Sequence, residues 1–120
     1  GRLSVGEIAN ELPFLPKRVF IVDHVPIDTQ RGGHAHHACH QFLFCAGGSC
    51  VVTVDDGTSR AVVVLESSSM GLHVPPLVWA AEERFAPGTQ LVVLASHAYD
   101  ADDYIHDFAE FTRLLARSPR

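Results

Sequence analysis

The chain has 120 residues, a formal net charge of −5 at pH 7, 47% hydrophobic residues and 19% charged residues. These values are typical of one globular domain with a modest core, and we expect a single domain over residues 1–120. The acidic balance argues against a nucleic-acid or anionic-membrane partner, so any anionic ligand has to be bound by particular arginines. The sequence has neither an apolar run of ~20 residues nor a signal-peptide pattern, which predicts a cytoplasmic protein.

Short runs of β-branched and aromatic residues, separated by turn residues, fill the first hundred positions and predict strands. The predicted strands cover residues 18–23, 41–46, 50–56, 60–66, 71–75 and 90–96. Asp56-Gly57 is a strong hairpin signal, because a type I′ turn needs residues that tolerate positive φ. Several of the strands are apolar almost throughout, as expected for strands buried on both faces. The pattern predicts an all-β sandwich or a small barrel.

The three cysteines, Cys39, Cys45 and Cys50, are odd in number and form no CxxC motif. Cys45 and Cys50 flank a tight turn and could face each other across a hairpin. The count favours three reduced cysteines in a cytoplasmic protein.

The last stretch changes to a helical period, with apolar residues recurring every three or four positions. This stripe consists of Ile105, Phe108, Phe111, Leu114 and Leu115. It predicts a helix over residues 102–116 that Asp100 or Asp102 caps and that packs on the β core through Phe108 and Phe111. We interpret the residues around its start as structural: Tyr99, Asp100, Asp103 and Tyr104.

The stretch "RGGHAHHACHQ", residues 31–41, holds four histidines and an arginine. On a strand alternate residues share a face, so His34 and His36 project together, opposite His37. A turn near Ala38 would break this register before His40. Two imidazoles on an inward face can bind a metal, transfer protons or fill space with satisfied hydrogen bonds.

This HxH pattern in a β-rich chain resembles the first motif of the cupin superfamily. In metal-binding cupins a glutamate follows and a second motif supplies another histidine. Here Gln41 stands at the glutamate position, Trp79 or Ala80 stands where the histidine is expected, and His73 comes early in that segment. Stable divalent sites need three or four protein ligands, so we expect neither a metal nor another cofactor.

The resemblance is closest to the WxcM-like cupins. Four stretches carry it: "PFLPKRVFIVD", "RGGHAHHACHQFLFCAGGSCVVTVDDG", "GLHVPPLVW" and "LASHAYDADDYIHDFAEF". It implies a cupin double-stranded β-helix, a jelly-roll barrel with a C-terminal α-helix. It also implies a homodimer without metal that interconverts 3- and 4-keto groups of a dTDP-linked 4-keto-6-deoxyhexose in deoxysugar biosynthesis. His34 and His36 match the histidines of that family's active site.

The chemistry assigns roles to these residues, because histidine titrates near neutrality and can act as base and then as acid. We expect His36 to move the proton between C3 and C4, and His34 to assist at the sugar oxygens. Arg31 is a candidate ligand of the diphosphate, or forms an ordinary ion pair. Trp79 is a candidate for stacking on the nucleotide sugar, or belongs to the core. Gln41 is expected to hydrogen-bond a histidine and fix its tautomer.

The sequence departs from the family pattern at several polar positions. Phe20-Ile21 lacks an expected tyrosine, His37 replaces a lysine, Ala80 a histidine and His106 an arginine, and a further arginine is expected just before Gly1. These changes favour a slow or altered isomerase. The alternatives are a non-catalytic cupin module that binds a nucleotide sugar, and a metal-dependent cupin of another function.

Overall fold

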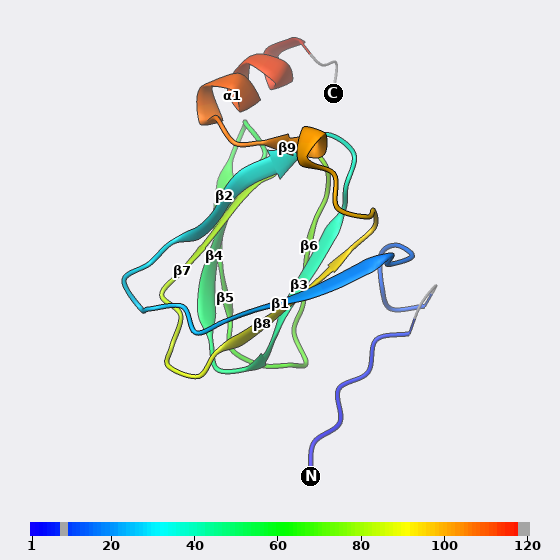
Figure 1. Ribbon diagram of the computed structural model, residues 1–120, viewed down its shortest axis with the longest axis vertical. Helices are drawn as coiled ribbons and strands as arrows, with labels where there is room; N and C mark the ends of the chain where they lie inside the picture. The colour runs from blue at the N-terminus through cyan, green and yellow to red at the C-terminus, as the bar shows by residue number, and fades with distance from the viewer. Residues whose placement is uncertain (8–9, 118–120) are drawn as a thin grey trace.

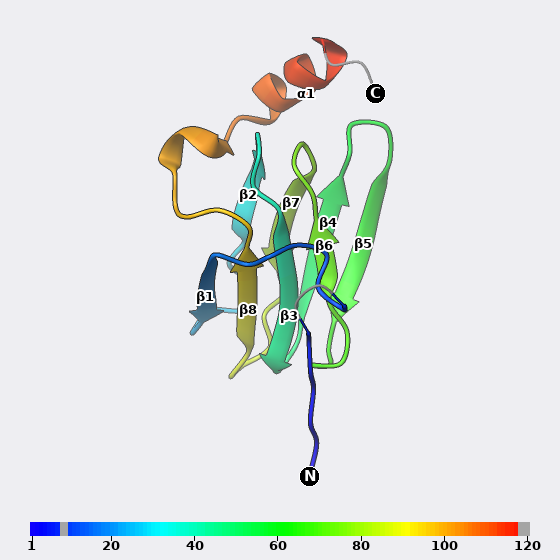
Figure 2. The ribbon, with the colours of Figure 1, turned by 90° about the vertical axis from the view of Figure 1, so that its right-hand side faces the viewer.

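The protein, described by a computed structural model over residues 1–7 and 10–117, consists of two antiparallel sheets that face each other (Figures 1 and 2). The first sheet has the order β1–β8–β3–β6, with β1 at Arg18–Asp23, β8 at Gln90–Ala95, β3 at Gln41–Gly47 and β6 at Leu72–Val74. The second has the order β5–β4–β7–β2–β9, with β5 at Arg60–Leu65, β4 at Cys50–Asp55, β7 at Trp79–Glu83, β2 at Arg31–His36 and β9 at Tyr104–Ile105.

The main core lies between the sheets, because alternate residues of each strand point toward the facing sheet. Its buried members come from both sheets and from the loop after β7: Leu43, Cys45, Cys50, Val52, Leu65, Val74, Ala80, Phe85, Leu91 and Val93. The predicted mostly-β architecture with a C-terminal helix is thus confirmed. Closure of the sheets into a barrel stays a prediction.

All six predicted strands are present, with bounds that differ by at most one residue at either end. Sequence reasoning missed β7 altogether, because "WAAEE" is poor in the β-branched residues that favour strands. Pairing with both β4 and β2 makes β7 an inner strand of its sheet. The hairpin at Gly57 is also present, but only Gly57 of the two central residues has positive φ, so the turn is not type I′.

The predicted helix over residues 102–116 was wrong in its first six residues, 102–107. Residues Ala101–Asp103 form a 3-10 turn, β9 follows, and α1 begins only at Phe108 and ends at Arg117. The cap of α1 is Asp107, whose Oδ1 accepts a hydrogen bond from the Ala109 amide at 2.9 Å. Asp100 instead caps the 3-10 turn through the Asp102 amide. The helical spacing of the apolar residues gave no sign of these elements. β9 forms because it pairs with β2, which is far away in the sequence.

The helix α1 lies at the end of the molecule opposite the N-terminal segment (Figure 1). Phe111 is fully buried against Ala35 and Ile105, while Phe108 is 38% exposed. Phe111 therefore anchors the helix, and Phe108 contributes at the edge of the contact.

The three cysteines are buried and form no disulfide. The Sγ atoms of Cys45 and Cys50 lie 3.8 Å apart, so these two side chains do meet across the β3–β4 turn. Within residues 1–7 and 10–117, the α-helix α1 has 10 residues, and no helix is long and apolar enough to cross a membrane.

Candidate active site

Strand β2 positions the two predicted catalytic histidines between β7 and the edge strand β9 of the five-stranded sheet. It pairs with β7 on one side, where His34 lies opposite Ala80, and with β9 on the other, where His36 lies opposite Tyr104. The ladder with β7 shifts register between Gly32 and His34. Gly32 has φ +76°, and a Cβ there would collide with the carboxylate of Glu82. The bulge thus needs glycine, and it sets the direction of both imidazoles.

The ring of His36 is oriented by Asp103. His36 Nδ1 and Asp103 Oδ2 lie 3.0 Å apart, and the backbone amides of Ala38 and Cys39 donate to the same carboxylate at 2.8 and 3.1 Å. Burial alone would raise the pKa of Asp103, but these hydrogen bonds hold it below its ordinary value. An ionised Asp103 can only accept, so Nδ1 of His36 carries the proton.

The other ring nitrogen of His36 is left as a free base. His36 is 3% exposed, and its Nε2 is buried without a hydrogen-bond partner among the described residues. Burial lowers the pKa of His36, the bond to Asp103 opposes this, and the charges of Arg18 and His106 lower it further. The result is a neutral imidazole at pH 7 whose basic nitrogen is available to a substrate.

His34 lies beside His36, with ring centroids 5.1 Å apart at nearly right angles. Burial, and then the neighbouring His36 and His106, lower the pKa of His34 to about 4. His34 is therefore also neutral at pH 7, and it can exchange protons with hydroxyl groups without holding a charge.

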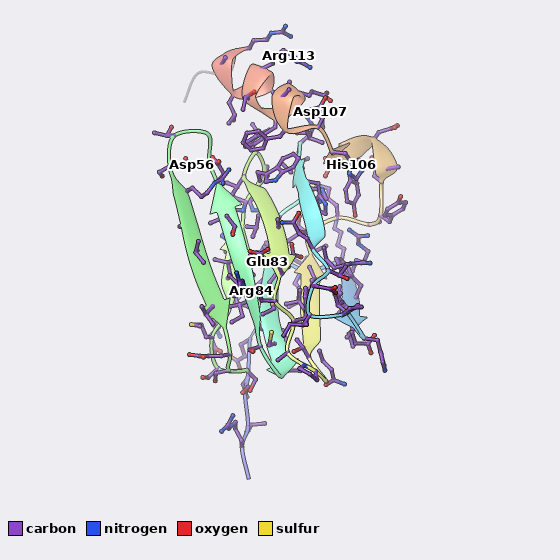
Figure 3. The ribbon with its side chains drawn as sticks, turned by 90° about the vertical axis from the view of Figure 1, so that its left-hand side faces the viewer. Asp56, Glu83, Arg84, His106, Asp107 and Arg113 are labelled. Carbon is purple, nitrogen blue, oxygen red and sulfur yellow. The ribbon has the colours of Figure 1, made fainter. Side chains whose placement is uncertain are left out.

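Tyr104 and His106 complete a group of rings around the pair. The Tyr104 ring centroid lies 4.4 Å from His36 and 5.0 Å from His34, and it stacks on His106 at 5.3 Å. Figure 3 shows His106 where the chain leaves β9 for α1, close to β2. The arginine that the family pattern led us to expect at this position is here an imidazole against His34, at 5.9 Å.

Arg18 and Gln41 face the histidines from the four-stranded sheet. Arg18 lies opposite Ala95 in the β1–β8 ladder, and Ala95 lies opposite Gln41 in the β8–β3 ladder. The three form one row across the sheet, and Gln41 is 7% exposed while Ala95 is fully buried. Gln41 thus points into the interior between the sheets, and its role in the site stays a prediction.

Arg31 lies exposed at the start of β2, opposite Glu82 in the β2–β7 register. Burial raises the pKa of Glu82 to about 7, and the charge of Arg31 opposes that rise. The structure therefore places Arg31 beside a carboxyl group, at the opposite end of β2 from His36.

Trp79 does not join the histidines. Its neighbour Ala80 points into the core and pairs with His34, so the indole projects from the opposite face of the sheet. There its ring contacts Phe108 and Phe111 of α1, at 5.2 and 5.6 Å between centroids. This placement favours the packing role.

His73, the possible substitute ligand, also lies elsewhere. Its strand neighbour Val74 is in the core, and His73 projects from the other face to contact His40 at 2.9 Å between ring nitrogens. The described residues contain one group of three potential metal ligands, His36, Cys39 and Asp103. Both oxygens of Asp103 already accept backbone amides, and the Cys39 thiol donates to the His40 carbonyl. The expectation of a metal-free site stays a prediction.

Sequence reasoning missed Arg18, Asp103 and Tyr104 as site residues. Asp103 and Tyr104 were assigned to the start of a helix, and the signal that could have found them was the "DYI" stretch itself. A polar residue followed by Tyr-Ile just before a capped helix is compatible with a short strand. The signal at Arg18 was weaker, because it was only a single charged residue at the start of an alternating apolar strand.

The structure is thus a protein of two facing antiparallel sheets, with a histidine between them whose ring is hydrogen-bonded to a carboxylate. Residues 1–116 match the family model "FdtA: WxcM-like, C-terminal", and the chain belongs to this family.

Three similar proteins are named as 3,4-oxoisomerases or 3,4-ketoisomerases. The chain is 37% identical over 117 residues to the TDP-4-oxo-6-deoxy-α-D-glucose-3,4-oxoisomerase of Aneurinibacillus thermoaerophilus, covering 98% of this chain and 84% of the relative. A crystal structure of a 3,4-ketoisomerase from Helicobacter canadensis is similar at a TM-score of 0.86 and 34% identity, covering 89% and 80% of the two chains. A mutant of the 3,4-ketoisomerase QdtA from Thermoanaerobacterium thermosaccharolyticum, in complex with TDP-4-keto-6-deoxyglucose, has a TM-score of 0.85 and 34% identity, covering 88% and 76%.

Proposed function

We propose that this protein is a sugar 3,4-ketoisomerase that acts on a dTDP-linked 4-keto-6-deoxyhexose through histidine acid–base chemistry. The observation that carries the proposal is the buried, unpartnered Nε2 of His36, whose Nδ1 is held by Asp103. The similarity to named 3,4-ketoisomerases supplies the substrate class. The proposal includes a single cupin domain over residues 1–120, with the sheets closed as a jelly-roll barrel.

The reaction needs a base that can return its proton. The C3 hydrogen of a 4-keto sugar is acidified by the adjacent carbonyl, and Nε2 of His36 removes it as a proton. The C–H electron pair forms the C3–C4 double bond, and the carbonyl π pair moves onto the C4 oxygen. A proton then passes from the C3 hydroxyl to the C4 oxygen, His36 protonates C4, and the C3 oxygen becomes the carbonyl. Atoms and electrons balance without any redox partner.

His34 suits the transfer between the two oxygens. Its pKa of about 4 keeps the imidazole neutral at pH 7, so it can accept one hydroxyl proton and donate another. Its ring lies at 5.1 Å from that of His36, so one sugar can contact both.

The nucleotide part requires a cation outside the histidine pair. Arg31 is the proposed diphosphate ligand, because it is exposed at the start of β2 and guanidinium binds phosphate oxygens in a bidentate manner. Gln41 is proposed to hydrogen-bond the sugar or a histidine from the facing sheet.

The departures from the family pattern act inside this site. Ala80, opposite His34, leaves a methyl group where an imidazole is expected, and Phe20 packs against the core instead of offering a hydroxyl. Fewer polar contacts to the sugar support a slow or altered isomerase rather than a fast one.

The decisive experiment follows the C3 hydrogen of dTDP-4-keto-6-deoxyglucose by NMR in deuterated water. We expect enzyme-dependent exchange at C3 even where net isomerisation is slow, because proton removal precedes delivery to C4. Binding without exchange would instead identify a nucleotide-sugar-binding module. Exchange that disappears with a chelator and returns with a divalent ion would identify a metal-dependent cupin.

We also propose that the protein is a homodimer joined through the outer face of the four-stranded sheet. On the edge strand β1 of that sheet, Val19 and Ile21 are 60% and 59% exposed. Next to them the outer face carries Phe42, Phe44 and Leu94, which line a cavity of about 480 Å³ beneath the N-terminal segment. An exposed apolar face of this extent is typical of a protein–protein interface.

A second copy of the chain is the occupant that the family resemblance implies. An obligate interface buries on the order of 2,000 Å² or more, and an apolar sheet face can supply it. Light scattering at micromolar concentration should give twice the chain mass, and Ile21→Lys should shift it toward the monomer. A wild-type monomer would contradict the proposal.

A further inference from the structure

Two buried polar atoms in the described part of the chain lack a hydrogen-bond partner, Nε of Arg18 and Nε2 of His36. One is a donor and the other, with Nδ1 protonated, is an acceptor. Buried polar groups are hydrogen-bonded in the large majority of cases, so each unsatisfied one calls for a ligand. That both belong to residues of one site indicates a single ligand that offers an acceptor and an acidic hydrogen close together.

Arg18 has no anion among the described residues to neutralise it. None of the ion pairs formed by residues 1–7 and 10–117 includes it. Its guanidinium instead lies over the rings of Phe20 and Tyr99, at 5.2 and 5.6 Å from their centroids. Ring faces attract a cation but accept no strong hydrogen bond, so the guanidinium is held in place while its Nε–H has no hydrogen-bond partner among the described residues.

The guanidinium is connected to the proposed base through two rings, because it lies over Tyr99, Tyr99 contacts Tyr104, and Tyr104 contacts His36. Arg18 enters the interior from β1, in the row that contains Ala95 and Gln41, and faces the histidines across the two sheets. Its charge is one of those that lower the pKa of His36. A cation here would raise the energy of a protonated His36 unless an anion forms between the two residues.

We propose that Arg18 is a further catalytic residue, which hydrogen-bonds the C4 oxygen of the sugar as that oxygen becomes an enediolate. The proposal rests on the proposed function. The C4 oxygen is bonded to the carbon next to C3, so base and cation would act on adjacent positions of the sugar from the two facing sheets. The diphosphate is bonded to C1, farther along the sugar ring. The negative charge that leaves the C3–H bond ends on the C4 oxygen, where a preorganised guanidinium stabilises it.

The test compares Arg18→Met with Lys17→Met in wild-type background. Arg18→Met removes the charge and keeps an unbranched side chain, and we expect C3 exchange to fall by about 10²–10³-fold. The dissociation constant of dTDP should change by less than about 3-fold, since dTDP carries the diphosphate and not the sugar. Lys17 is the exposed cation next in the chain, and Lys17→Met should leave both quantities unchanged.

Two further measurements separate this role from a structural one. Arg18→Lys retains the charge but not the planar donor pair, so exchange should fall by only about tenfold; it also serves if Arg18→Met does not fold. In the ligand-free protein, Arg18→Met should raise the pKa of His36 in an NMR titration, whatever the activity.

The outcomes are distinguishable. If wild-type protein exchanges C3 and Arg18→Met exchanges equally fast, the proposal for Arg18 is wrong. If Arg18→Met weakens dTDP binding by the factor by which it slows exchange, Arg18 binds the diphosphate and the proposal is again wrong. If the wild type shows no exchange, the proposed function itself fails. An unchanged His36 titration in Arg18→Met would place the guanidinium too far from the base to act on the adjacent oxygen, and would overturn the proposal for Arg18 while leaving the proposed function intact.

Discussion

The protein contains two close pairs of histidines with opposite surroundings. His34 and His36 lie on the inner face of β2, with ring centroids 5.1 Å apart. His40 and His73 lie on the outer face of the four-stranded sheet, with centroids 5.2 Å apart and the ring of Phe14 against both. The centroid spacing is nearly the same, so proximity alone does not distinguish an active site from a packing contact.

The difference lies in what each nitrogen contacts. His40 and His73 hydrogen-bond each other directly, at 2.9 Å between Nδ1 and Nε2, which uses a donor of one ring and an acceptor of the other. His36 is bonded instead to the carboxylate of Asp103, and this bond fixes the tautomer and frees Nε2. The carboxylate partner therefore leaves a basic nitrogen available in the His34–His36 pair. The His40–His73 pair uses its nitrogens on each other and forms a structural contact.

The largest effect is expected from replacing one histidine of each pair. His36→Asn keeps some hydrogen bonding but removes the base, and C3 exchange should fall by roughly 10²–10⁴-fold. His73→Asn is the matched substitution in the outer pair and should leave exchange within about twofold. The readout is NMR of the C3 hydrogen in deuterated water. Exchange retained in His36→Asn, or lost in His73→Asn, would reverse the assignment of the two pairs.

A smaller effect should follow from removing only the orienting charge. In the wild type the two oxygens of Asp103 accept hydrogen bonds from the amides of Ala38 and Cys39 and from His36. Asp103→Asn leaves one oxygen for these donors. The amide NH₂ group would then face Nδ1 and move the imidazole proton to Nε2. We expect exchange to slow by about 10²-fold with dTDP affinity unchanged, because the base has the wrong tautomer.

The control for that variant is Asp100→Asn, since Asp100 caps the adjacent 3-10 turn without contacting His36. It should cost about 1 kcal/mol in the free energy of unfolding and little in rate. Equal rates for Asp103→Asn and wild type would show that His36 does not depend on the carboxylate.

The strands could be predicted from the sequence because each carries its own local signal. Val, Ile and Phe alternate or cluster between turn residues, and the two faces of each sheet follow from period two. The short β9 could not be found in this way. Tyr104 and Ile105 form a strand only because β2 lies beside them, 68 to 70 residues earlier in the chain in its register.

The same reasoning explains which part of the site was predicted. His34 and His36 share a strand, so alternation alone placed them on one face. Asp103 lies in the 3-10 turn and Arg18 in β1, and no local pattern encodes that these two elements meet at the histidine pair. For Trp79 the sequence left stacking on the ligand and a place in the core both open, and the pairing of Ala80 with His34 turns the indole toward α1.

The smallest effect concerns acid stability and again compares the pairs. Burial is the main reason that the pKa of His34 falls from 6.5 to about 4 in the folded protein. Between these pH values the unfolded chain binds a proton at His34 that the folded protein does not, so stability declines as pH falls through this range. The shift corresponds to about 3 kcal/mol at 1.36 kcal/mol per pH unit, and partial exposure reduces this to about 2.

Urea unfolding at pH 7 and pH 4.5 measures this for wild type, His34→Gln and His73→Gln. Glutamine does not titrate, so the loss expected for wild type is absent in His34→Gln. Relative to wild type, the free energy of unfolding of His34→Gln should therefore rise by about 2 kcal/mol on going from pH 7 to pH 4.5. Groups that titrate in every variant cancel in that difference. The pKa of His73 is also lowered, by burial and by His40, so His73→Gln should gain in the same direction but less. If the free energy of unfolding of His34→Gln did not rise relative to wild type, the pKa of His34 would not be lowered by burial. His34 and His36 would then be exposed to solvent, which would contradict the buried site that the base requires.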